Sequence, residues 1–486
     1  MSYLLHTKFY IPPAQSNLLP RLRLVAKLQE GLSNPLVVIC APAGFGKTTL
    51  LSEWRESVEG RDFPLAWLAL EEEDNDPIRF LTYLIAALQT LREDIGLEAL
   101  VSLQSAASPK TILTDLIGSL EGLAESYALV LEDYHTIHEN SVHDLTAFLV
   151  SHLPLQMRLI LSTRLTPPLS LSRLRVRGQL AEILSNDLCF SLEETTIFFN
   201  QVMGLNLSEE DVARLYERTE GWIAGLKLVA LSLQGTNSSP SRFISEFTGS
   251  HHLVADYLIE EVLTGLPDEV RNFMLQTSSL GCLSGPLCDA ATGRSDGQEM
   301  LEWLERANLF TVRQDDDRQW FRYHHLFADL LRNRLRQTDP RSETGYLRKA
   351  ADWYLENEMP EWAIYMVLEA GDYRLATELI EQTASIIAAH GETDFLQRYL
   401  ARLPEDVLRD HPDLRRLIPQ PRASPLTDRE REVLSLIANG ASNREVAEAL
   451  VVSLGTVKKH LNNIFHKLEA QNRSQAVARA RESGYL

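Results

Sequence analysis

The chain has 486 residues, of which 44% are hydrophobic and 23% charged, and its net charge is −20. This length exceeds one ordinary core, and the composition is that of a folded globular protein, so we expect several domains. The acidic balance excludes a protein that coats nucleic acid with most of its surface. Residues 425–486 differ from the rest, because they hold nine Lys and Arg against seven Asp and Glu. That net of +2 leaves −22 on the remainder, a pattern that indicates an acidic body with a small nucleic-acid-binding end.

Cysteine usage and hydropathy indicate the compartment. No CxxC pair occurs, and no run of about 18 apolar residues or long apolar leader is present. We therefore expect a cytoplasmic protein without membrane spans. We also favour free thiols over a Cys282–Cys288 disulfide for the four cysteines, which are Cys40, Cys189, Cys282 and Cys288.

In chain order, a polar lead-in over residues 1–34 precedes five apolar runs, at 35–41, 65–70, 127–131, 158–162 and 180–184. Helical patterns lie between them, at 48–56, 77–91 and 111–125. Asp76 followed by Pro77 is typical of a helix start, since a carboxylate caps the helix and proline suits its first position. Continuous apolar strands that alternate with helices predict a parallel α/β sheet.

After about residue 187 the strand patterns fade and amphipathic helices follow over 190–340. Two strand-like patches, at 309–313 and 320–323, flank an acidic turn at 315–317, as in a β-wing. Residues 345–404 read as paired helices, whose small and aromatic residues indicate one or two tetratricopeptide-like hairpins. A proline-containing stretch over 417–425 predicts a semi-rigid linker before a last helical segment.

Residues 41–49, APAGFGKTT, join the first apolar run to a helical pattern. Glycines let backbone N–H groups surround phosphate oxygens, Lys47 reaches the β and γ phosphates, and the Thr48 hydroxyl ligates Mg²⁺. The sequence is a variant, because Ala41 stands at the first position of GxxxxGK followed by Ser or Thr. The alternative is a turn that happens to contain GKT, which the strand–loop–helix context disfavours. We expect ATP or ADP to be bound by Gly44, Phe45, Gly46, Lys47, Thr48 and Thr49.

Acidic and basic side chains follow the later apolar runs. Glu132 and Asp133 end the run that begins at residue 127, so we expect Glu132 to contact Mg²⁺ and Asp133 to polarise water or assist a switch. Solvated acids at an ordinary strand end are the alternative. Arg164 ends the next run, faces the crevice of an open α/β sheet and can sense a γ-phosphate, unless it is a plain surface arginine. The acidic residues 71–76 are interpreted as a solvated helix-start cluster rather than a metal site.

The last segment predicts a helix-turn-helix. Thr427 with Glu430, and Ser442 with Glu445, form two capping boxes, and a third helix spans 454–468. No acidic residue occurs from 449 to 468, so its outer face suits DNA phosphates and bases. The alternative is a helical interaction domain with a solvated basic face. A last helix at 474–482 can pair two subunits. The polar outer residues are Lys458, Lys459, His460, Asn462, His466 and Lys467, and the inner residues are Val457, Leu461, Ile464 and Leu468.

Six segments resemble, in order, motifs of the MalT-like group of LuxR-type regulators, within the signal-transduction ATPases called STAND. They are LLHTKFYIPP, APAGFGKTTL, LVLEDYH, LSTR, EGWIAGLKLVALSL at 220–233 and WFRYHHLF at 320–327. The terminal TDREREVL, NREVAEAL and GTVKKHLNNIFHKL are similar to the LuxR/FixJ-type helix-turn-helix. Several independent motifs in one order, over nearly the whole chain, make the resemblance specific.

The resemblance implies a multidomain protein, in which an α/β P-loop nucleotide-binding domain (1–187) precedes mostly α-helical domains. These are a small helical domain (188–248), a winged-helix domain (249–342), a tetratricopeptide-like arm (343–416), the linker (417–425) and the helix-turn-helix domain (426–486). It also implies that ADP goes with a closed resting state, and that ATP plus an inducer favours a self-associating, DNA-binding state. By the same resemblance His324 or His325 touches the nucleotide phosphates, although a core histidine is the alternative. The residues placed at double-stranded DNA are Thr456, Val457, Lys458, Lys459 and Asn462.

Two departures from the group stand out. Glu132 replaces the usual Asp, which lengthens the metal-side carboxylate by one methylene. At most two hairpins stand where such regulators carry a long tetratricopeptide sensor, so the chain is either a short member or one whose sensor has been removed.

Three functions compete. The first is a nucleotide-switched transcription activator that contacts RNA polymerase and responds to a small-molecule or protein inducer, with at most slow ATPase activity. The second is a dedicated P-loop ATPase whose helical end binds protein. The third is a scaffold that holds ADP structurally. The basic face of the third helix favours the first.

Overall fold

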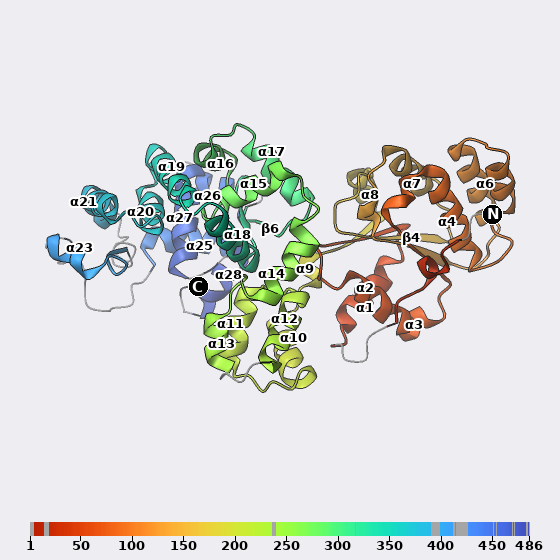
Figure 1. The fold of residues 1–486 in the computed structure, drawn as a ribbon, viewed down its shortest axis with the longest axis horizontal. Helices are drawn as coiled ribbons and strands as arrows, with labels where there is room; N and C mark the ends of the chain where they lie inside the picture. The colour runs from red at the N-terminus through yellow and green to blue at the C-terminus, as the bar shows by residue number, and fades with distance from the viewer. Residues whose placement is uncertain are drawn as a thin grey trace. The chain divides into compact units, whose positions relative to one another are not determined.

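The computed structural model describes residues 4–13, 19–235, 240–315, 317–389, 399–411, 414, 426–450, 452, 454–468, 470, 472–482 and 485. Two compact units make up the chain. The first unit comprises residues 1–265 with 306–310, and the second unit comprises 266–305 with 311–486. Figure 1 labels the helices and strands of both.

The first unit contains a five-stranded sheet in the order β2-β3-β4-β1-β5, and every strand pairing in it is parallel. All residues of β1 and β3 are buried, which explains their continuous apolar runs, since strands covered on both faces have no solvent side. The predicted parallel α/β sheet is thus confirmed. The strands are β1 (Leu36–Cys40), β2 (Leu65–Ala69), β3 (Tyr127–Glu132), β4 (Met157–Thr163) and β5 (Leu180–Leu184).

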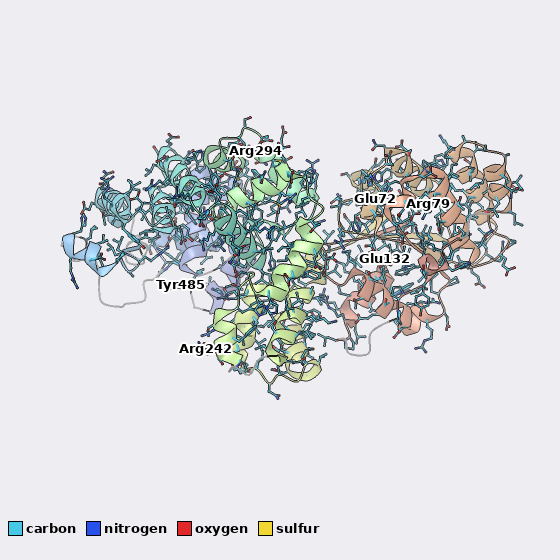
Figure 2. The ribbon with its side chains drawn as sticks, viewed as in Figure 1. Glu72, Arg79, Glu132, Arg242, Arg294 and Tyr485 are labelled. Atoms are coloured by element: carbon cyan, nitrogen blue, oxygen red, sulfur yellow. The ribbon has the colours of Figure 1, made fainter. Side chains whose placement is uncertain are left out.

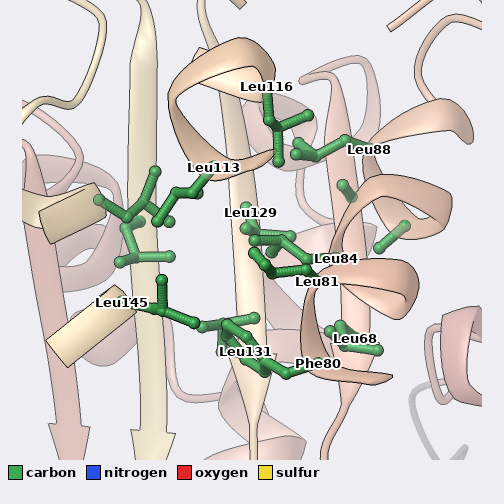
Figure 3. Packing of buried hydrophobic residues seen from close by; sticks show 14 of the residues in the cluster. Leu68, Phe80, Leu81, Leu84, Leu88, Leu113, Leu116, Leu129, Leu131 and Leu145 are labelled. Carbon is green, nitrogen blue, oxygen red and sulfur yellow. The ribbon is translucent and has the colours of Figure 1, made fainter. Parts of the chain in front are cut away.

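Helices pack on this sheet through a leucine-rich core. Figure 3 shows side chains of α4, among them Leu81 and Leu84, against Leu129 of β3, with Leu113 and Leu116 of α6 beside them. The Asp76 carboxylate accepts a hydrogen bond from the Arg79 N–H at 2.7 Å and so caps α4, as predicted. The helices of this region are η1 (His6–Phe9), α1 (Leu22–Gly31), α2 (Lys47–Glu56), α3 (Val58–Arg61), η2 (Glu72–Asn75), α4 (Pro77–Gln89), α5 (Leu97–Gln104), α6 (Pro109–Glu121), η3 (Tyr134–Thr136), α7 (Asn140–Ser151) and α8 (Leu171–Val176).

In the described parts of residues 185–265, which leave out 236–239, the regular secondary structure is entirely helical, as predicted. Two of them are short π-helical turns, η4 and η5. The separate stretch 306–310 belongs to this unit too, where the Thr166 N–H donates to the Arg306 carbonyl oxygen at 3.3 Å. The helices are α9 (Ser185–Leu188), α10 (Leu192–Ile197), η4 (Phe198–Val202), α11 (Glu209–Thr219), α12 (Ile223–Gln234), α13 (Pro240–Glu246), α14 (His252–Leu258) and η5 (Ile259–Leu263).

The second unit begins with helices and one short hairpin. Strands β6 (Thr311–Arg313) and β7 (Phe321–Tyr323) pair antiparallel, as the two strand-like patches predicted. Helix α19 packs on α20, and α20 packs on α21, with Ala350, Ala351 and Ala363 buried between them. The helices are α15 (Asp268–Thr277), α16 (Gly285–Thr292), α17 (Gly297–Arg306), α18 (His325–Thr338), α19 (Ser342–Glu356), α20 (Pro360–Glu369), α21 (Tyr373–Ala389) and α23 (Glu405–Asp410).

Four helices with their own hydrophobic core end the second unit. They are α25 (Asp428–Ala438), α26 (Asn443–Leu450), α27 (Leu454–Lys467) and α28 (Arg473–Glu482). Both predicted capping boxes form, since Thr427 exchanges hydrogen bonds with Glu430, and Ser442 with Glu445. The predicted linker 417–425 lies outside the described residues, as do Val451 and Ser453 of the turn before α27.

The acidic residues 71–76 are mostly solvated, as the sequence predicted, since Glu71, Glu72, Glu73 and Asp76 are exposed, but Asp74 is an exception. Asp74 is fully buried and forms ion pairs with the buried Lys8 and with Arg79. The Lys8 ammonium also lies 4.5 Å from the centroid of the Tyr83 ring. The burial of Asp74 could not be predicted, because its partner Lys8 is more than sixty residues away in sequence and local composition does not reveal it. The lead-in is therefore anchored to the first unit by a buried ion pair.

Within the described residues, no helix has the length and apolar character that crossing a membrane requires. All four cysteines are free thiols, as predicted.

Candidate functional site

The loop between β1 and α2 carries the glycine-rich motif. Gly44 and Gly46 have φ of +77° and +80°, a left-handed conformation that favours glycine. Gly46 directly precedes the first residue of α2, so the backbone N–H groups at the helix start are available to an anion. This is the strand–loop–helix context that the sequence predicted.

Lys47 is buried at the base of this loop. Its ammonium donates hydrogen bonds to the carbonyl oxygens of Ala41 and Pro42, at 2.8 and 3.0 Å. Burial and, to a smaller extent, the nearby Arg164 charge together lower the pKa of Lys47 to about 8, while Asp133 opposes the shift. A buried cation that is hydrogen-bonded to neutral carbonyl oxygens favours an anion nearby, because a phosphate supplies the negative charge that the carbonyls lack.

Thr48 and Glu132 meet across the end of the sheet. The Thr48 hydroxyl donates to Glu132 Oε1 at 2.5 Å, and Glu132 is the last residue of β3. Glu132, labelled in Figure 2, is 6% exposed. Burial raises the pKa of this carboxyl, the Thr48 hydrogen bond opposes the rise, and the neighbouring Asp133 charge adds to it. Two side chains with hard oxygen atoms, the kind that can bind Mg²⁺, thus lie beside the loop, and the longer Glu side chain reaches Thr48.

Asp133 and His135 follow β3. Asp133 has a left-handed backbone (φ +54°), and burial raises the pKa of its carboxyl against the opposing charges of Lys47 and Arg164. Sequence reasoning gave His135 no role. Its Nδ1 lies 3.7 Å from Asp133 Oδ1, and burial, with the charges of Arg164 and Lys47, lowers its pKa to about 3. His135 is therefore neutral at physiological pH and can orient Asp133 or a water molecule. Its position two residues after Asp133 was the available signal.

Arg164 follows β4, at the same edge of the sheet as Lys47 and Glu132. Its guanidinium pairs with the Glu261 carboxylate at 2.7 Å and donates to the Glu261 carbonyl oxygen at 3.1 Å. Glu261 belongs to η5, a segment that no sequence pattern linked to Arg164. The Asn308 amide donates to the Arg164 carbonyl oxygen at 3.0 Å. Arg164 thus joins the sheet edge to two later segments of the chain.

The segment 220–233 contacts the glycine-rich loop directly. The Trp222 indole N–H donates to the Ala43 carbonyl oxygen at 3.1 Å, and the Ala224 N–H donates to the Gly44 carbonyl oxygen at 3.0 Å. A Cβ placed on Gly44 would lie 2.5 Å from the Ala224 Cβ. The Trp222 ring also packs edge-on against Phe310, with centroids 5.2 Å apart. The sequence singled out EGWIAGL as a motif but gave it no contact with the loop.

His324 and His325 lie in the second unit. His324 is buried and directly precedes α18, whose first residue is His325. A contact of His324 or His325 with the nucleotide phosphates stays a prediction.

The predicted DNA-contacting residues lie on α27, with two differences from the expected surface. Val457 is 0% exposed and belongs to the core of the four helices, so its side chain does not face a groove. Lys467, expected on the solvated basic face, forms a buried ion pair with Glu430 at 2.8 Å. This pairing was missed because Glu430 had been assigned to its capping box alone. Thr456, Lys458, Lys459 and Asn462 are partly exposed, and the side chain of His466 lies outside the described residues.

Comparison with known proteins locates two family domains. Residues 259–343 match the MalT winged helix domain, and residues 424–480 match the luxR family of bacterial regulatory proteins. The chain is 36% identical over 415 residues to the HTH-type transcriptional regulator MalT of Klebsiella pneumoniae subsp. pneumoniae, which covers 85% of this chain and 46% of that protein. With MalT of Serratia proteamaculans the identity is 35% over 415 residues, or 85% of this chain and 45% of that protein.

Two solved structures are also similar. A Walker-type ATPase of Pyrococcus abyssi has a TM-score of 0.48 and 14% identity, over 67% of this chain and 99% of that one. A STAND protein with a tetratricopeptide repeat sensor from Pyrococcus horikoshii has a TM-score of 0.35 and 13% identity, over 98% of this chain and 78% of that one. The chain spans less than half the length of the curated relatives that it matches.

Proposed function

Since this chain is a member of the MalT-like group of LuxR-type regulators, we propose that it is a transcription regulator whose DNA binding depends on ATP or ADP at residues 41–49. The observation that carries the proposal is the convergence of Lys47, the Thr48–Glu132 pair and Arg164 at one edge of the parallel sheet. Ligands of open α/β sheets bind at this edge, where strands end and helices begin.

The residues at this edge suit a magnesium nucleotide. Lys47 and the N–H groups at the start of α2 would hold the phosphates, together with the backbone of residues 44–46 and Thr49. Thr48 and Glu132 would ligate Mg²⁺, which would neutralise phosphate charge. Asp133, oriented by His135, would hold a water molecule, and hydrolysis would be slow and serve only to reset the switch. A contact of His324 with the phosphates is part of this proposal.

Arg164 provides the means to distinguish two nucleotides. Its guanidinium pairs with a carboxylate at Glu261, and a terminal phosphate would compete for the same cation. A nucleotide shifts a conformational equilibrium only through unequal affinity for the two states, so a contact that one nucleotide offers and the other lacks is the required element. ATP would draw Arg164 away from η5, and ADP would leave the Arg164–Glu261 pair in place.

The four C-terminal helices would bind double-stranded DNA. Thr456, Lys458, Lys459 and Asn462 on α27 supply the cationic and amide groups that phosphates and base edges accept, while Val457 holds the helix in place. In the ATP state the chain would self-associate, contact RNA polymerase and activate transcription. This change would respond to an inducer, either a small molecule or a protein.

A single substitution tests the proposal. Lys47→Ala removes the buried ammonium, so ADP and ATP affinity should fall roughly 30-fold, the loss expected for one charge-assisted phosphate contact. Titration calorimetry measures it. ATP should also tighten duplex binding relative to ADP in the wild-type chain and have no such effect in the variant.

Lys27→Ala is the matched control, since it removes one lysine charge from α1 of the same unit at a partly exposed ion pair with Asp187. Normal nucleotide affinity in Lys47→Ala would refute the assignment of the loop. Tight nucleotide binding without duplex binding in either nucleotide would favour an ATPase or an ADP-holding scaffold instead.

A further inference from the structure

Lys458 and Lys459, the two lysines on the outer face of α27, are largely shielded from solvent. Lys458 donates a hydrogen bond to the Gln319 side-chain carbonyl oxygen, and its ammonium lies 3.9 Å from Asp315 Oδ2. The Lys459 ammonium lies 3.8 Å from Glu361 Oε1. The two lysine side chains are 19% and 27% exposed. An ordinary surface pair on the neighbouring helix α26, Arg444 with Glu448, is far more open, at 82% and 72%.

The carboxylates of Asp315 and Glu361 are buried, and they accept few hydrogen bonds from other groups. Asp315 lies in the turn between β6 and β7, where its Oδ1 accepts hydrogen bonds from the Gln319 and Trp320 N–H groups. Its Oδ2 has no hydrogen-bond partner among the described residues, and neither has either carboxylate oxygen of Glu361, near the start of α20. A buried carboxylate without hydrogen bonds is unfavourable unless a cation lies beside it. Lys458 and Lys459 supply these cations.

We propose that Asp315, Gln319 and Glu361 form a docking site for α27, and that the docked helix cannot bind DNA. The inference rests on the proposed function, because it concerns the helix that would enter the groove. Carboxylate and amide oxygens occupy the positions around the lysines that phosphate oxygens would take on a duplex. One ammonium cannot be buried against a carboxylate and neutralise a phosphate at the same time, so docking and DNA binding exclude each other.

The site lies in parts of the second unit that precede the DNA-binding helices. Asp315 and Gln319 belong to the β6–β7 turn, and Glu361 belongs to the arm, so two segments distant in sequence approach two successive lysines. Apparent duplex affinity is reduced by the fraction of molecules in which α27 is undocked. Any event that moves either segment thereby raises DNA affinity without changing the DNA-contacting residues.

Amine labelling of the full chain tests docking without DNA. Limited acetylation, followed by mass spectrometry, measures the rate at each lysine, with the exposed Lys349 as internal reference. Lys458 and Lys459 should label about tenfold more slowly than Lys349, because a docked amine reacts only while it is open. In Asp315→Asn/Glu361→Gln both should approach the rate of Lys349. Equal labelling of all three lysines in the wild-type chain would overturn the proposal.

Two further variants sharpen the result. Gln319→Ala removes only the acceptor of Lys458, so it should accelerate labelling at Lys458 and leave Lys459 unchanged. Glu369→Gln is the matched control, since it removes one charge from the same helix, α20, at a pair with Arg402. It should change neither rate. Acceleration in Glu369→Gln as large as in the double variant would attribute the effect to net charge and contradict a specific site.

Duplex binding completes the test. At one fixed salt concentration, Asp315→Asn/Glu361→Gln should bind a mixed-sequence duplex about tenfold more tightly than Glu369→Gln. Faster labelling with unchanged duplex affinity would show that the docked helix does not limit DNA binding, and would overturn the proposal. If no form binds duplex, the proposed function fails, and the labelling rates alone decide whether the docking site exists.

Discussion

The nucleotide loop and the helix α27 both hold lysines away from solvent, and they differ in what surrounds the charge. Lys47 leans on two neutral carbonyls of its own loop, whereas Lys458 and Lys459 lie beside buried carboxylates from other segments. A phosphate that binds Lys47 therefore adds a countercharge. A phosphate that binds Lys458 or Lys459 of α27 must displace the carboxylate that already lies beside it.

This difference assigns the two regions different roles. The loop is prepared for its anion, because burial destabilises the cation even with Asp133 and Glu132 nearby, as its lowered pKa indicates. The helix α27 is held back from its anion, because an internal competitor occupies the lysines. On the proposed function, regulation of DNA binding would reside in the release of α27, whereas nucleotide binding would need no comparable release.

The largest expected effect is a loss of stability on replacing Lys467. This lysine of α27 has a structural role, unlike the docking lysines Lys458 and Lys459. Lys467→Met leaves Glu430 buried and unpaired, so the four C-terminal helices should lose about 3 kcal/mol of unfolding free energy. Hydrogen exchange of the α25 amides measures this loss. Arg444→Met, which breaks an exposed pair, should cost less than about 0.5 kcal/mol. Equal losses in the two variants would mean that the Lys467–Glu430 pair is not buried in solution.

The next effect probes the buried charge of Lys47. The protonated form of Lys47 binds phosphate, and its pKa in the free chain is about 8. As pH rises through that value the free chain loses the proton, so ADP affinity should weaken about tenfold between pH 7 and pH 9. Calorimetric titration across this range measures the change. Lys47→Arg stays charged over the whole range and should give a flat profile, and a flat wild-type profile would place the Lys47 pKa well above 9.

The smallest effect concerns the ion pair between Arg164, which follows β4, and Glu261 of η5. Glu261→Gln frees Arg164 from its carboxylate partner, so affinity for ATP should rise about threefold relative to ADP, a modest change because the pair is partly exposed. The neighbouring and exposed Glu260→Gln removes the same charge and should leave the ATP/ADP ratio unchanged. A shift of equal size in both variants would reduce the effect to net charge.

Local patterns were enough to predict much of the architecture. Continuous apolar runs located the five strands, and the capping boxes at Thr427 and Ser442 located the starts of α25 and α26, because these signals depend on neighbours in sequence. The motif at 41–49 likewise predicted the loop, since the turn, the lysine and the helix start are consecutive.

Pairings between distant residues could not be predicted in this way. Lys8 with Asp74, Arg164 with Glu261, and Lys467 with Glu430 each join residues dozens of positions apart. Periodicity assigns a residue to a face of its helix but does not say what covers that face. The basic residues of α27 therefore appeared solvated from sequence, although the fold buries Lys467 and places carboxylates beside two others.

Combining the two proposals, we propose that nucleotide at residues 41–49 governs whether α27 is docked. The most direct test is the acetylation rate of Lys458 in the full wild-type chain, measured with ADP and then with ATP bound. With ADP bound Lys458 should label slowly, and with ATP bound its rate should be close to that in Asp315→Asn/Glu361→Gln. Identical rates with the two nucleotides, both bound at saturation, would contradict it.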